Sequence, residues 1–206
     1  QILCLHGYRQ NKDLFKQKTG SFRKLLKSLA EFDFVDSPHT VDPIAQTEND
    51  ERSWWFTSLD RTYVSKTPSD YDKGFDESLA SLQSYVKENG PFDGLMGFSQ
   101  GAAFAAIICS LCQLGKFCAD FKFVILVAGF KSLCSPHSNY YNVTLDIPSL
   151  HVIGDTDNVI SKERSLELLE IFKSPDVSRH PGGHYVPASK DYKQTYTDFI
   201  SKFIAK

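Results

Sequence analysis

The amino-acid sequence predicts a doubly wound α/β fold, in which a mostly parallel sheet lies between two layers of helices. Apolar segments of strand length alternate along the chain with segments whose apolar residues recur at helical spacing, a pattern typical of this class. The run FKFVILVAGF at 121–130 is almost entirely apolar, as expected for a strand buried on both faces of a parallel sheet. No repeat, linker or low-complexity tract divides the 206 residues, so we expect one minimal domain spanning 1–206.

The first half of the chain supplies three of the expected strands. These strands span 1–5, 32–37 and 92–98, and the helices between them span 13–30, with Gly20 as a candidate break, and 71–88. Phe22, Leu25 and Leu29 follow helical spacing within the first helix. Residues 38–70 combine prolines, acids and aromatic side chains, which predicts a long loop, and loops of that length are usually functional or disordered.

The second half continues the alternation. The expected strands span 121–130, 149–154 and 177–180, and the helices span 102–114, 162–173 and a C-terminal segment from Lys190. Right-handed connections between parallel strands bring their carboxyl ends to one edge of the sheet, where ligands bind in open α/β folds. The residues that follow each strand are therefore the first candidates for a functional site.

Composition excludes several classes of function. The net charge is −2 and lysines alternate with acids, so we expect no nucleic-acid surface. No apolar run reaches the roughly 18 residues of a membrane span, and the opening QILCLHG lacks the basic region of a signal peptide. Five irregularly spaced cysteines favour free thiols in a reducing compartment, the cytoplasm or the nucleus. We expect Cys109 and Cys112 to be core residues, because no second pair of ligands accompanies them.

The clearest functional signal is Ser99, in the stretch GLMGFSQGAA between a predicted strand and a predicted helix. A G-x-S-x-G match alone is weak evidence, because an ordinary helix cap produces the same pattern. Later strand ends supply two acids in GDTDNVI, at 154–160, and a histidine in GGHYVP, at 182–187. Serine, acid and histidine follow one another in the order of the nucleophile-elbow hydrolases, so we expect Ser99 to be a catalytic nucleophile.

Within these loops we favour His184 and Asp157 as the partners of the serine. Of the six histidines only two follow the acids, and His180 is expected inside a strand beside Pro181, whereas two glycines precede His184 and give its ring room to reach across. Asp155 is well placed to fold the turn. Asp157 lies further out on the loop, where its carboxylate would hold the tautomer of the histidine.

The residues around Ser99 and after the first strand suit the same chemistry. A serine on a sharp strand-to-helix turn needs small neighbours, and Gly97 and Gly101 provide that clearance. The backbone N–H of Gln100, directly after the serine, and that of Tyr8, in the first loop, are expected to form an oxyanion hole. We expect no metal in the site.

The aromatic segment Trp54-Trp55-Phe56 has two interpretations. Its place in a long polar loop is consistent with an acyl- or aryl-binding wall of a substrate pocket, and a simple core position is equally open. His6 and His151 are expected to be structural residues rather than participants in proton transfer.

With these residues in view, the chain resembles the FSH-type serine hydrolases of the α/β-hydrolase fold, whose animal members are the ovarian-cancer-associated-gene serine hydrolases. The resemblance extends from residue 1 to about residue 187 and is carried by ILCLHGYRQN, KTGSFRKLLK, WWF, PFDGLMGFSQGAA, FVILVAGF, PSLHVIGDTDNVI and GGHYVP. It implies a carboxylic-ester hydrolase without a cofactor, with Ser99, Asp157 and His184 as its triad. Family members act on alkyl or acyl esters, and fungal relatives act on polyketide thioesters.

The sequence therefore predicts hydrolysis of a small-molecule ester through an acyl-enzyme intermediate. Three alternatives stay open: an acyl-thioesterase, a peptidase of the same fold, and a catalytically idle hydrolase fold that serves as a binding module. The sequence leaves the physiological substrate and the oligomeric state open.

Overall fold

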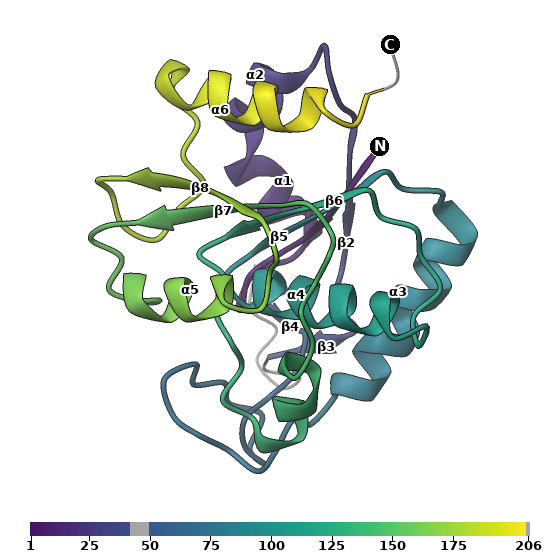
Figure 1. Ribbon diagram of the computed structural model, residues 1–206. Helices are drawn as coiled ribbons and strands as arrows, with labels where there is room; N and C mark the ends of the chain where they lie inside the picture. Colours follow the sequence, from purple (N-terminus) through teal and green to yellow (C-terminus); the bar gives the residue numbers. More distant parts are fainter. Residues whose placement is uncertain (42–49, 205–206) are drawn as a thin grey trace.

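The computed structural model describes residues 1–41 and 50–204, and their centre is a six-stranded sheet (Figure 1). Its strand order is β2-β1-β5-β6-β7-β8, and every neighbouring pair is parallel. The strands are β1 (Ile2–Leu5), β2 (Phe32–Val35), β5 (Gly94–Phe98), β6 (Phe123–Val127), β7 (Ser149–Gly154) and β8 (Pro175–His180). The order reverses direction between β1 and β5, so the sheet is doubly wound, as the sequence predicts.

Helices cover both faces of this sheet (Figure 1). One layer holds α1 (Lys12–Lys18), α2 (Gly20–Leu26) and α6 (Lys190–Ser201), and the opposite layer holds α3 (Phe75–Asn89), α4 (Gln100–Gln113) and α5 (Lys162–Leu169). The rings of Phe22 and Tyr196 join α2 to α6 edge to face, with centroids 4.9 Å apart. Central strands β5 and β6 are buried along their whole length, because helices lie against both of their faces.

Helix α4 is the central helix of the fold and the one that the site depends on. Its residues are buried from Gln100 to Leu111, and it packs against β5 and β6. A helix that is apolar on nearly all sides belongs inside a protein rather than at its surface. Its first residue therefore has a fixed position at the carboxyl end of β5.

Several boundaries differ from the sequence prediction for local reasons. The expected helical region 13–30 is divided into two helices at its candidate break, since α1 ends at Lys18 and α2 begins at Gly20, but α2 ends at Leu26, four residues earlier than expected. The expected loop 38–70 contains a small antiparallel pair, β3 (His39–Thr40) and β4 (Arg52–Ser53), while residues 42–49 lie outside the described part. The loop after β6 contains a 3-10 helix, η1 (Ser135–Tyr141), that the sequence did not predict.

Candidate active site

Ser99 occupies the turn between β5 and α4, and its backbone is strained. Its φ is 54° and its ψ is −117°, a left-handed region that side-chain-bearing residues seldom adopt. The Ser99 N–H donates to the Val127 carbonyl at 2.9 Å, and its own carbonyl accepts the N–H groups of Ala102 and Ala103. Its side chain makes no capping hydrogen bond to the helix. The hydroxyl is therefore not used as a helix cap, and the cap interpretation does not account for this serine.

The two glycines that flank Ser99 allow the turn to lie this close to its neighbours. A Cβ on Gly97 would collide with the backbone of Gly101 and Ala102, and a Cβ on Gly101 would collide with the carbonyl oxygens of Leu5 and His6. In each case the obstacle is backbone, which cannot rotate away. The glycines thus set the approach of α4 to β1 and β5.

Asp157 and His184 form a hydrogen-bonded pair in the loops that follow β7 and β8. Asp157 Oδ2 lies 2.7 Å from His184 Nδ1, and Asp157 Oδ1 accepts the N–H groups of Val159 and Ile160 at 2.8 and 2.9 Å. Burial raises the pKa of Asp157, but the hydrogen bonds from His184, Ile160 and Val159 outweigh it, so the pKa is lowered overall. An ionised Asp157 requires a proton on Nδ1, which leaves Nε2 of His184 as the nitrogen that can accept one.

His184 lies next to the strand end that carries the serine. Its ring packs on the ring of Phe98, the residue before Ser99, with centroids 4.7 Å apart. Its side chain is 20% exposed, whereas that of Asp157 is 2% exposed. The pair therefore has a buried acid and a base that reaches the surface of the strand-end edge.

The competing acid and histidine have other partners. Asp155 accepts a hydrogen bond from Arg179 Nε at 2.8 Å, which joins the ends of β7 and β8. His180 is buried against the ring of Tyr185, at a centroid distance of 4.8 Å, and burial lowers its pKa. The Asp155 N–H donates to the His180 carbonyl at 2.8 Å, but no hydrogen bond or ion pair joins their side chains within the described residues, so the side-chain pair that the structure brings together is Asp157 and His184.

The backbone N–H groups of Tyr8 and Gln100 have no hydrogen-bond acceptor within the described residues. In the same loop the N–H of Gly7 donates to Gln10 Oε1, that of Gln10 donates to the Gly7 carbonyl and that of Arg9 donates to the Arg52 carbonyl. Tyr8 lies in the loop after β1 and Gln100 begins α4 directly after the β5 turn, and these two parallel strands are neighbours, so both N–H groups lie beyond the same edge of the sheet.

The side chain of Gln100 has a structural role that is separate from its backbone N–H. Its amide is fully buried, Oε1 accepts the Trp54 N–H at 3.0 Å, and Nε2 donates to the Trp55 carbonyl at 2.8 Å. It also lies within hydrogen-bond distance of Ser53 Oγ. A glutamine at the start of an otherwise apolar helix is the sequence signal that indicates such an anchor, because buried amides need partners.

The structure places Trp54, Trp55 and Phe56 in the core, at 0, 0 and 1% exposure. The ring of Trp54 stacks on Phe104 of α4, with centroids 4.9 Å apart, and its Nε1 donates to the His6 carbonyl at 2.8 Å. The hypothesis of a substrate-binding wall is therefore corrected to the core interpretation. Aromatic residues in a polar sequence context can still be buried when a helix supplies the apolar surface and an amide pairs with their backbone.

His6 is a neutral structural residue behind the first loop. Its ring is completely buried, Nδ1 donates to the Gly7 carbonyl at 2.8 Å, and Nε2 accepts the Ser37 N–H at 3.1 Å. Burial lowers its pKa to about 4. It holds the loop that carries Tyr8 and has no nitrogen left for proton transfer.

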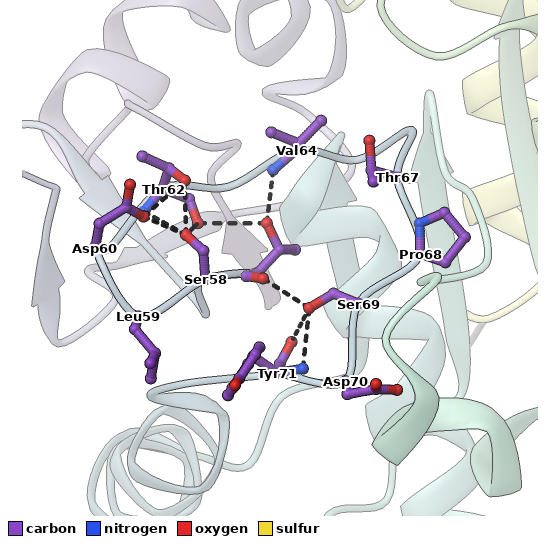
Figure 2. A pocket seen from close by; sticks show the side chains of 11 residues that line it. Ser58, Leu59, Asp60, Thr62, Val64, Thr67, Pro68, Ser69, Asp70 and Tyr71 are labelled. Carbon is purple, nitrogen blue, oxygen red and sulfur yellow. Dashed lines mark hydrogen bonds between the residues drawn. The ribbon is translucent and has the colours of Figure 1, made fainter.

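Two hollows are relevant to the site. One, of about 410 Å³, opens beside His184 and is bounded by Phe98 and by residues of α1. The other is larger, about 630 Å³, and is lined by residues of the loop 57–71, with none of Ser99, Asp157 and His184 among them (Figure 2). Several of its polar side chains bond their own loop, as where Ser69 Oγ donates to the Thr57 carbonyl at 2.6 Å, and Asp70 accepts from Ser135 Oγ of η1 at 2.9 Å. The cleft beside His184 is therefore the candidate for substrate.

Within residues 1–41 and 50–204, no group of three or more histidine, cysteine or acidic side chains is arranged to hold a metal ion. In the same part of the chain, no helix combines the length and apolarity that crossing a membrane requires.

Comparisons with known proteins assign the family. Residues 1–196 match the family model described as serine hydrolase (FSH1). The chain belongs to the FSH1 serine hydrolase family. It is 44% identical to esterase OVCA2 of Danio rerio, covering 98% of this chain and 97% of that protein, and 44% identical to esterase AGAP003155 of Anopheles gambiae, covering 97% and 76%.

Among solved structures, this serine hydrolase is similar to acyl-protein thioesterase 2 of Zea mays, with a TM-score of 0.61 at 20% identity, covering 97% of this chain and 93% of that one. At that identity the likeness concerns the fold, which is the α/β-hydrolase fold expected from the sequence. The family and its named members show an esterase-type hydrolase that acts on small-molecule substrates.

Proposed function

We propose that this serine hydrolase cleaves carboxylic esters by transferring the acyl group first to Ser99 and then to water. The observation that supports it most is the 2.7 Å contact between Asp157 and His184, at the same sheet edge as the strained serine turn. A buried carboxylate, an imidazole oriented by it and a hydroxyl not used as a helix cap are the three parts that nucleophilic acyl transfer needs.

The proposed reaction has two halves. Ser99 Oγ attacks the ester carbonyl while His184 Nε2 takes the hydroxyl proton, and the N–H groups of Tyr8 and Gln100 stabilise the oxyanion. The C–O bond to the alcohol breaks as His184 returns the proton to the departing oxygen, which leaves an acyl-enzyme. Water then attacks this ester with His184 as base, and the carboxylic acid is released. Asp157 stabilises the imidazolium in both halves.

A thioester fits the same sequence of steps, because a thiolate can leave in place of an alkoxide. The likeness to the maize acyl-protein thioesterase makes thioesters the second substrate class to test. Matched oxygen and thioesters of one acyl group, compared by kcat/KM, separate the two classes.

All five cysteines are free in the structure, which supports our further proposal of a reducing compartment such as the cytoplasm.

Labelling with a fluorophosphonate probe tests the nucleophile. We expect the wild-type protein to be labelled and Ser99→Ala to be unlabelled, with a loss of about six orders of magnitude in kcat for ester hydrolysis. Ser69→Ala is the matched control, because that hydroxyl lies in the hollow of the loop 57–71 and bonds only its own loop.

The outcomes separate the proposed function from its alternatives. Absence of labelling in the wild type would favour the idle binding module. Ester hydrolysis by Ser99→Ala within tenfold of the wild type would exclude Ser99 as the nucleophile.

A further inference from the structure

The cleft beside His184 has walls suited to an apolar group of substrate size. Its volume is about 410 Å³, and Phe15 of α1, Phe98 of β5 and Val186 of the histidine loop line it. Tyr185, which is half exposed, forms part of its rim. Clefts of this size and composition hold small ligands, with a few polar groups that determine which ligand fits.

The polar groups of this cleft are hydrogen-bond donors. Lys18, at the end of α1, makes no ion pair or hydrogen bond through its ammonium within the described residues. Gln10 accepts the Gly7 N–H through Oε1, at 3.3 Å, and no acceptor in the described residues takes its Nε2 hydrogens. No carboxylate belongs to the lining. A cation and an amide donor above apolar walls favour a ligand that joins an apolar body to an anionic group.

The chemistry of the site indicates which half of the ester lies here. His184 returns its proton to the oxygen of the departing alcohol, so that alcohol must stand against the imidazole. The cleft is bounded by the same ring. The alcohol half is therefore the part of the substrate that this cleft receives.

We propose that the cleft beside His184 binds the alcohol half of esters whose alcohol carries a carboxylate or phosphate, and that Lys18 selects for this anion. The inference rests on the proposed ester hydrolysis and adds its substrate class. Because Lys18 is exposed, its pairing with the anion contributes about a fivefold preference and weakens with salt.

A pair of synthetic esters tests this selectivity. 4-Carboxyphenyl butanoate carries the anion on the alcohol, and 4-carbamoylphenyl butanoate is its neutral counterpart of similar shape. We expect Lys18→Met to lower the ratio of their kcat/KM values about fivefold by reducing hydrolysis of the anionic ester alone. In the wild type, 0.5 M NaCl should lower the same ratio, since a Debye length of roughly 4 Å screens an exposed pair.

Lys16→Met is the matched control. Lys16 lies one half-turn earlier on α1, is also exposed, and does not line the cleft, so its loss should leave the ratio unchanged. An equal fall in both variants would assign the effect to the overall surface charge and would overturn the proposal.

Two further outcomes would overturn the inference. One is an unchanged ratio in Lys18→Met. The other is an effect of Lys18→Met on the succinyl ester of 4-hydroxybenzamide, whose anion lies on the acyl half, without an effect on the 4-carboxyphenyl ester. If the proposed function itself is wrong, Ser99→Ala will still hydrolyse the neutral ester. This result is independent of the Lys18 selectivity and so distinguishes the two failures.

Discussion

Two carboxylates in different regions have similar hydrogen bonding and different surroundings. Asp60, in the loop 57–71, accepts hydrogen bonds from Ser58 and Thr62, and Asp157 accepts from two backbone N–H groups and from His184. Hydrogen bonds from Ser58 and Thr62 lower the pKa of Asp60, and hydrogen bonds lower that of Asp157 against the effect of burial. Asp60 is exposed and serves its own loop, whereas Asp157 is buried and orients a base.

The difference shows what distinguishes a site from a well-bonded loop. The larger hollow belongs to the loop 57–71, where the side chains of Ser58, Asp60 and Thr62 bond one another and Ser69 Oγ bonds the backbone of the same loop (Figure 2). The cleft beside His184 is smaller, but two of its lining groups have no hydrogen-bond acceptor or ion-pair partner within residues 1–41 and 50–204, namely the Lys18 ammonium and Nε2 of Gln10. Volume alone therefore does not identify the site.

Replacing the carboxylate of Asp157 or Asp60 by an amide is the strongest test of the difference between them. We expect Asp157→Asn to lower kcat by about 10⁴, because the amide stabilises the wrong tautomer of His184. Asp60→Asn should leave kcat unchanged, since its partners are confined to its own loop. Steady-state hydrolysis of a p-nitrophenyl ester measures both, and similar losses in the two variants would contradict the distinction. Asp155→Asn, within threefold of the wild type, is the control for the neighbouring acid.

The close packing of Gly101 beside the Ser99 turn provides a second test, which measures protein stability. Gly101→Ala adds a methyl group against two backbone carbonyls, and we expect a loss of about 3 kcal/mol in the free energy of unfolding. Gly20→Ala, at the start of α2, meets no atom within 4 Å and should change stability by at most about 1 kcal/mol. Urea denaturation measures both values. Equal stability of the two variants would show that α4 can move away from β1.

The pH dependence of stability provides a third test, because buried His6 and the two carboxylates Asp60 and Asp157 affect stability in different pH ranges. The pKa of His6 falls from 6.5 to about 4 on burial, so the unfolded chain takes up this proton before the folded protein does. Stability should therefore be complete above pH 6.5 and decrease towards pH 4, by about 1.4 kcal/mol per pH unit for this histidine. The lowered pKa values of Asp60 and Asp157 affect stability only at lower pH. Their stabilising contributions are present above about pH 3.8 and are lost below it.

Urea denaturation between pH 7 and 4.5 measures how the free energy of unfolding changes with pH. His6→Asn should reduce this slope by the contribution of one proton, about 1.4 kcal/mol per pH unit. The titration of the His6 ring in the wild-type NMR spectrum is an independent check. A ring that becomes charged near pH 6.5 would contradict the assignment of a neutral buried histidine.

The fold could be predicted from sequence because its signals are local. The strand 149–154 was predicted with the bounds that the structure has, since six buried residues stand between clear turn residues. Boundaries were predicted less well: Gln100 begins α4 two residues earlier than expected, and α1 ends where the Thr19 N–H bonds the carbonyls of Phe15 and Gln17. The residue types at these positions do not show where the hydrogen bonds of a helix begin or end.

For the site, sequence order determined Ser99, two acids and two histidines as candidates, because parallel strands bring successive strand ends to one edge, and the neighbouring residues favoured Asp157 and His184 among them. Only the tertiary structure decided the rest. It buried Trp54 to Phe56 against α4 and used the Gln100 amide to hold them there. It also placed Lys18 at the cleft of His184. These contacts join residues far apart in the chain, and the geometry that creates them exists only after the sheet and its helices have packed.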